Sequence, residues 1–159
     1  MKVYIGRWPK GDKERKVSIR IDKWDSWNAD HTLALIAAPL LIQLKENKQG
    51  APFVDDEDVP EGLNLRSTEA PARENDWDTD ENHFKRWDWV MNEMIFAMQA
   101  IAQDDGDSQF YDHSEIDENA PLTKQVKQLK VDHVGLKAYH DRIQNGCRLL
   151  GRYFQNLWD

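Results

Sequence analysis

The residues best suited to chemistry in this chain are a carboxylate and an imidazole on two predicted helices. Glu93 lies in the segment DENHFKRWDWVMNEMIFAMQ, residues 80–99, between Trp89 and Phe96 on an apolar arc. A buried carboxylate needs a partner, and His140, in the apolar seam of a later helix, is the candidate. The pair is either the centre of a hydrolase or a structural contact within the core. Asp88 lies about 140° from Glu93 around the helix, so these two carboxylates do not form a neighbouring pair.

Other reactive residue types do not form a recognisable centre. The histidines lack the spacing of a metal site, and neither DDED (55–58) nor DDGDS (104–108) has the spacing of a calcium loop. Cys147 falls in an apolar helical seam, where thiols are usually inert, and no G-x-S-x-G motif or phosphate-binding loop occurs. The sequence therefore predicts no catalytic residue, no metal and no cofactor. It leaves an enzymatic activity open but favours none.

A basic and aromatic turn near the N-terminus is the candidate ligand-binding site. The segment GRWPKGDKERK places Trp8 among the basic residues Arg7, Lys10, Lys13 and Arg15. Aromatic stacking combined with phosphate contacts can hold a nucleotide or a single strand. The alternative is an exposed charged turn without a ligand.

A β-hairpin is expected to carry this turn. The segments KVYIGRW and KVSIRIDKW alternate apolar and polar residues on either side of Pro9 and Gly11, which predicts a hairpin over 2–24 with one buried face. Because a lone hairpin is only marginally stable, it is expected to lie on helices or to pair with more strands.

Helical periodicity predicts three long helices, at about 30–48, 79–102 and 131–157, the last beginning at either Leu122 or Val131. Long polar loops, 49–77 and 103–122, connect them. Pro39 must kink or split the first helix. The second and third helices are expected to lie side by side, and Gly135 and Gly146, eleven residues apart, would allow a close backbone approach.

The expected fold is α+β: a single domain, residues 1–159, with an N-terminal β-hairpin or small antiparallel sheet packed on a three-helix bundle.

Composition narrows the class of protein. The chain has 159 residues, a net charge of −8, seven tryptophans, most of which are expected in the core, and one cysteine, which excludes an internal disulfide. No apolar run predicts a signal peptide or a membrane span. Residues 2–23 hold eight Lys or Arg against three acids, whereas 104–118 holds seven acids and no Lys or Arg. The acidic total makes duplex DNA an unlikely partner.

Four motifs carry a family resemblance: W-D-x-W-x-x-D-H-T-L-A, F-V-D-D-E-D-V-P, W-D-x-V-x-x-E-M-I and N-L-W-D. With these motifs the chain resembles a family of small uncharacterised proteins of tailed phages, T4-like phages among them. The resemblance implies a bacteriophage protein that acts in the cytoplasm of an infected bacterial host. It brings no activity and no site residues with it.

Four functions follow as expectations. The first is a non-enzymatic accessory protein that binds a host or phage macromolecule, most simply a protein. The second is a protein that binds or sequesters a nucleotide at Trp8 and the neighbouring basic residues. The third is a metal-dependent hydrolase centred on Glu93 and His140, and the fourth is a minor virion component.

Overall fold

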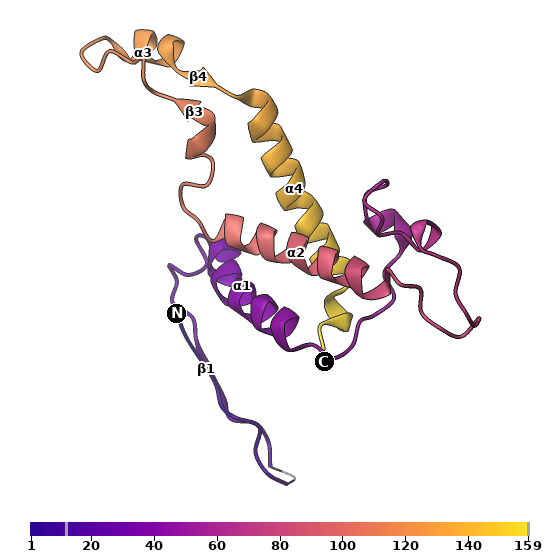
Figure 1. Ribbon diagram of the computed structural model, residues 1–159. Helices are drawn as coiled ribbons and strands as arrows, with labels where there is room; N and C mark the ends of the chain where they lie inside the picture. Colours follow the sequence, from indigo (N-terminus) through magenta and orange to yellow (C-terminus); the bar gives the residue numbers. More distant parts are fainter. Residues whose placement is uncertain (12, 159) are drawn as a thin grey trace.

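The computed structural model describes residues 1–11 and 13–158 (Figure 1). Its helices are α1 (Ala29–Asn47), α2 (His83–Ile101), α3 (Leu122–Gln128) and α4 (His133–Arg152). Its strands are β1 (Lys2–Ile5), β2 (Val17–Arg20), β3 (Tyr111–Asp112) and β4 (Lys130–Val131), which form two antiparallel pairs, β1–β2 and β3–β4. The expected α+β class, with an N-terminal antiparallel hairpin and packed helices, is confirmed. None of the described helices is long and apolar enough to cross a bilayer.

Helix α2 forms the centre of the core. Its buried face includes Trp87, Val90, Met91, Met94 and Ala97, each at most 2% exposed. Helix α1 packs on one side of it and α4 on the other, and the connecting loop adds the side chains of two valines, Val54 and Val59. A helix that is apolar on two faces can bury both only between two neighbours, which explains its central place.

Helix α1 runs antiparallel to α2. Near its start His31 lies 3.5 Å from Asp104, and near its end Lys48 pairs with Asp88 at 2.7 Å. The helix continues through Pro39, so the proline does not split it. The carbonyl that loses its hydrogen bond belongs to Leu35, which is exposed, so water can replace the missing donor.

Helix α4 approaches α2 through Gly146, one of the two glycines expected to allow a close approach. A Cβ atom on Gly146 would lie 2.5 Å from the Cβ of Ala97 and would overlap the carbonyl oxygen of Glu93. Only glycine allows this contact. Gly135 lies elsewhere, beside Asp132 and the ring of Phe110.

The third helix, expected to begin at either Leu122 or Val131, is two helices separated by a short strand. Helix α3 ends at Gln128, β4 follows, and α4 begins at His133, where the Asp132 carboxylate accepts a hydrogen bond from the Gly135 N–H at 2.9 Å. Strand β4 pairs with β3, so the segment predicted as the loop 103–122 contains structure that the periodicity did not reveal.

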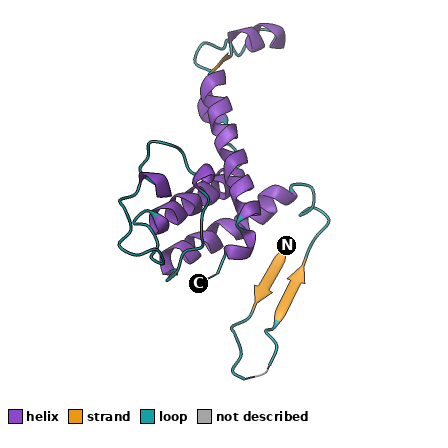
Figure 2. Cartoon of the chain, turned by 90° about the vertical axis from the view of Figure 1, so that its right-hand side faces the viewer, coloured by secondary structure: helices purple, strands orange, loops and turns teal. Residues whose placement is uncertain are grey.

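The N-terminal hairpin differs from the expectation in one respect. It forms with the register Val3–Ile19 and Ile5–Val17, but every residue of both strands is exposed. It extends away from the helices (Figures 1 and 2). The prediction of one buried hairpin face, and of its packing on the helices, is therefore wrong. The alternation does place the apolar side chains on one face, but the chain turns at 21–28 in a way that directs the strands outward.

Candidate functional site

Glu93 has a partner, but the partner is not His140. The Glu93 side chain lies on α2 and is 7% exposed, and its two carboxylate oxygens accept hydrogen bonds from Arg142 on α4, at 2.7 Å from Nη2 and 3.0 Å from Nε. The Arg142 guanidinium also lies 3.7 Å from the ring centroid of Phe96. The hydrogen bonds to Glu93 raise the pKa of Arg142 above its usual range. This contact links the two helices.

His140 instead faces Asp107, with Nε2 at 3.1 Å from both carboxylate oxygens, and about half of its side chain is exposed. The predicted Glu93–His140 pair is therefore wrong. Because Gly146 places the α4 backbone against α2, the buried line of α4 is centred on Gly146 and Leu149, which turns His140 outward. The centre proposed for a hydrolase is not assembled.

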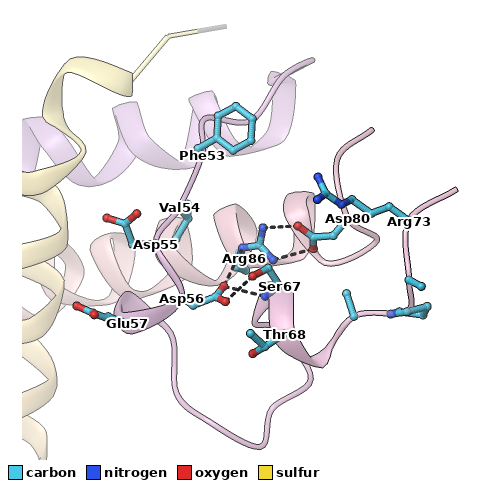
Figure 3. Close-up of a pocket in the computed structure, with 13 residues that line it drawn as sticks. Phe53, Val54, Asp55, Asp56, Glu57, Ser67, Thr68, Arg73, Asp80 and Arg86 are labelled. Atoms are coloured by element: carbon cyan, nitrogen blue, oxygen red, sulfur yellow. Dashed lines mark hydrogen bonds and ion pairs between the residues drawn. The ribbon is translucent and has the colours of Figure 1, made fainter. Parts of the chain in front are cut away.

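A cavity of about 870 Å³ lies beside the start of α2, between the loop around Asp56 and the loop around Ser67 (Figure 3). The Arg86 side chain, 3% exposed, donates two hydrogen bonds to Asp80, at 2.8 and 2.7 Å. Asp56 accepts hydrogen bonds from the backbone N–H and the hydroxyl of Ser67, the former at 2.7 Å. Among the described residues Arg86 Nε has no hydrogen-bond partner, and it lies 3.9 Å from Asp56.

The carboxylates of this cavity are held in their charged form by these contacts. The hydrogen bonds from Arg86 lower the pKa of Asp80 despite its partial burial. Burial alone would raise the pKa of Asp56, but the hydrogen bonds from Ser67 outweigh it and the pKa is lowered. Acids that are already engaged within the chain are poor general acids or bases. The contacts of Arg86 with Asp80, the Leu65 carbonyl and Asp56 instead hold the loop 49–77 against the start of α2.

A second network connects the same loop to α4. Asp58 is buried, and its carboxylate accepts hydrogen bonds from the hydroxyl of Tyr153 at 2.5 Å and from Arg148 at 2.6 Å, with Arg152 at 2.9 Å. Burial and the hydrogen bond to Asp58 raise the pKa of Tyr153 to about 12. Asp58 of the acidic run DDED thus connects the loop to α4 inside the fold. The sequence offered one signal for it, the basic residues at 148 and 152 on one face of a helix.

The basic turn of the hairpin is placed at the surface. Trp8 is 79% exposed, and the Arg15 guanidinium lies 4.9 Å from its ring centroid while donating a 2.6 Å hydrogen bond to the Gly6 carbonyl. The structure thus brings Trp8 and Arg15 together. The other three residues predicted for this site are exposed around them: Arg7, Lys10 and Lys13. They line an open surface, not a pocket.

The two faces of the hairpin have different chemistry. Since directly opposite residues share a face, one face carries Val3, Ile5, Val17 and Ile19, which we call the apolar face of the arm. The opposite face is polar and basic and carries four residues, Lys2, Tyr4, Ser18 and Arg20. We call residues 1–27 the N-terminal arm.

Tryptophans lie mainly outside the core, contrary to expectation. Only Trp87 is fully buried, and five of the seven are more than 60% exposed: Trp8, Trp24, Trp27, Trp77 and Trp158. Three of these belong to the arm. Exposed tryptophan is uncommon on surfaces that have no partner and common in binding surfaces.

An apolar groove of about 430 Å³ opens between α1, the end of α2 and the end of α4. We call this the helical groove. Leu33, Leu40 and Phe154 on its walls are each about two-thirds exposed, and Cys147 and Asp30 also line it. Burial raises the pKa of the Cys147 thiol, which keeps it protonated at neutral pH, so it is not an activated nucleophile.

Within residues 1–11 and 13–158, no group of three His, Cys, Asp or Glu side chains is arranged to hold a metal ion. Comparison with family models, with curated proteins and with solved structures found no match to this chain.

Proposed function

We propose that this chain is a non-enzymatic phage accessory protein that binds an acidic host or phage protein in the infected bacterium, through its N-terminal arm. The bacterial setting rests on the family resemblance of the four sequence motifs. The binding role rests on one observation, the exposure of a basic, tryptophan-rich hairpin that extends away from the helices.

Charge supports an acidic partner. Residues 1–27 contain eight Lys or Arg against four Asp or Glu, a net charge of +4. Because the whole chain carries −8, residues 28–159 carry −12. A basic arm on an acidic body attracts acidic surfaces to the arm alone, and this separation favours one orientation of binding.

Shape favours a macromolecule over a nucleotide. Small ligands bind in concave sites that cover most of their surface, whereas Trp8 and its basic neighbours stand on an open turn. The Arg15 guanidinium already lies over one face of the Trp8 ring and competes there with a base for stacking. A thermal-shift measurement with mononucleotides and cyclic dinucleotides is expected to show no stabilisation.

The test is crosslinking and affinity capture from infected cells. The double variant Arg7→Glu with Lys10→Glu reverses two exposed charges of the arm, and Lys124→Glu with Lys127→Glu reverses two exposed charges far along the chain. We expect the arm variant to lose the captured protein at least about tenfold, and the control to retain it. Equal capture by both variants, or recovery of nucleic acid in place of protein, would contradict the proposal.

A further inference from the structure

Two apolar surfaces of this chain have no cover, the apolar face of the arm and the helical groove. Val3, Ile5, Val17 and Ile19 are between 39% and 57% exposed, although they form one continuous face. A two-stranded hairpin with an uncovered apolar face is marginally stable in water. Contiguous exposed apolar faces on proteins commonly mark surfaces that contact another surface, so this face is suited to docking.

The helical groove matches this face in chemistry and is long enough to hold it. Its walls are aliphatic and aromatic, with Asp30 as the one acidic residue among those that line it. Leu33 and Leu40 are seven residues apart on α1, which is about 10 Å along the helix. Val3 and Ile5 span about 7 Å of strand, and β2 lies about 5 Å beside β1, so the four side chains fit along this row.

The arm is held away from the helices of its own chain. At its root the Asp25 carboxylate accepts hydrogen bonds from the N-terminal ammonium group at 2.9 Å and from the Asp22 N–H at 2.6 Å. The Thr32 hydroxyl at the start of α1 donates to the Asp25 carbonyl at 3.1 Å. These bonds order the connection to α1, and the hairpin then extends outward (Figure 2).

We propose that the apolar face of the arm docks into the helical groove of a second copy of this chain, and that the second arm returns the contact to form a reciprocal dimer. Exchange of an identical element between two copies covers both arms and both grooves in a single assembly. The arm carries +4 and residues 28–159 carry −12, so the approach of the arm of one copy to the helices of the other is favoured by long-range attraction between their net charges.

This dimer leaves the polar face and the tip of the arm open. Lys2, Tyr4 and Arg20 lie on the face opposite the contact, and Trp8 lies beyond the strands. The inference therefore does not depend on the proposed binding of an acidic protein. Variants of the apolar face test the dimer, and variants of the basic tip test the partner.

The first test measures mass in solution by sedimentation over a wide range of concentration. The arm variant Ile5→Glu with Ile19→Glu and the groove variant Leu33→Glu with Leu40→Glu change exposed side chains, so both are expected to fold, which circular dichroism checks. We expect the wild type to be a dimer, each variant to be a monomer, and the polar-face control Tyr4→Glu with Ser18→Glu to remain a dimer.

Mixing the two variants gives the decisive result. An arm-variant chain still has an intact groove, and a groove-variant chain still has an intact arm, so one of the two contacts can form. We expect the mixture to associate although neither variant does so alone. A monomeric wild type at every concentration, or dimers that survive both pairs of substitutions, would overturn the proposal.

The single native cysteine provides a second test, because Cys147 lines the groove. In Ile19→Cys the new thiol is on the apolar face, and mild oxidation is expected to give a disulfide-linked dimer that Cys147→Ala abolishes. Ser18→Cys, on the opposite face, is the matched control and is expected to crosslink far less. An internal disulfide in a monomeric Ile19→Cys chain would show that the arm folds onto its own groove, which contradicts the exchange.

Discussion

Asp58 is the one buried carboxylate of the two acidic runs, DDED (55–58) and DDGDS (104–108). It is buried, and its oxygens are bound by Tyr153, Arg148 and Arg152, so one side chain connects the loop 49–77 to α4. Burial alone would raise the pKa of Asp58, but the hydrogen bonds from Tyr153 and Arg148 and the nearby positive charges outweigh it and lower the pKa. The carboxylate therefore stabilises the folded state only while it is charged.

Asp58→Asn is expected to reduce the free energy of unfolding by about 2 kcal/mol at neutral pH, since it removes charged hydrogen bonds in a buried setting. The exposed neighbour Glu57→Gln is the control and should change it by less than about 0.5 kcal/mol. Urea denaturation monitored by tryptophan fluorescence measures both. Equal stability of the two variants would show that the network carries no net energy.

The same carboxylate predicts the acid dependence of stability. Because the pKa values of Asp58, Asp56 and Asp80 are lower in the folded state, the unfolded chain binds more protons below about pH 4. The stabilisation is complete above the unfolded pKa and is lost as the pH falls through the folded values. Urea denaturation across this range should show a decline in the wild type that is shallower in Asp58→Asn. Parallel curves would contradict this assignment.

Two substitutions test whether Glu93 pairs with Arg142 and not with His140. Arg142→Met leaves the buried Glu93 carboxylate unpaired and should cost about 2 kcal/mol or more. His140→Ala removes an exposed contact with Asp107 and should cost less than about 1 kcal/mol. Thermal denaturation ranks the two variants. A larger loss for His140→Ala would restore the pair that the sequence favoured.

At the scale of elements, the contact between α2 and α4 depends on one glycine. Gly146→Ala places a methyl group on the Glu93 carbonyl and on Ala97, and such overpacking should cost about 1–3 kcal/mol. Gly151→Ala lies in the same helix with open space around it, and the better helix propensity of alanine should stabilise the protein by up to about 1 kcal/mol. We expect the two substitutions to shift the denaturation midpoint in opposite directions. Shifts in the same direction would contradict the close approach of α4 to α2 at Gly146.

At the scale of the molecule, stability is distributed unevenly. Helix α2 has ten buried residues between two neighbours, whereas neither face of the arm is covered within one chain. Amide hydrogen exchange of a monomeric arm variant should therefore be slowest in α2 and faster by orders of magnitude in β1 and β2. Peptide-level mass spectrometry measures this, and in the wild-type dimer the arm should become protected. Protection of the arm equal to that of α2 in the monomer would mean that the helices of its own chain cover it.

The sequence alone determined the long helices and the N-terminal hairpin, because they follow from local periodicity, but it did not reveal the short pair β3–β4. The spacing of Trp87, Met91, Met94 and Met98 gave the central helix, the alternation of Val3, Ile5, Val17 and Ile19 gave the hairpin, and the glycine at 146 gave the site of close approach. The open basic turn at Trp8 followed from composition in the same way.

Only the tertiary structure decided which residues meet. A helical seam is defined to about one residue in rotation, and a shift of that size moved His140 outward and brought Arg142 to Glu93. Periodicity likewise shows that a strand has an apolar face but not what lies against it. That choice is made by long-range packing and by the direction in which the chain leaves Asp25, so the arm's apolar face remains open within a single chain.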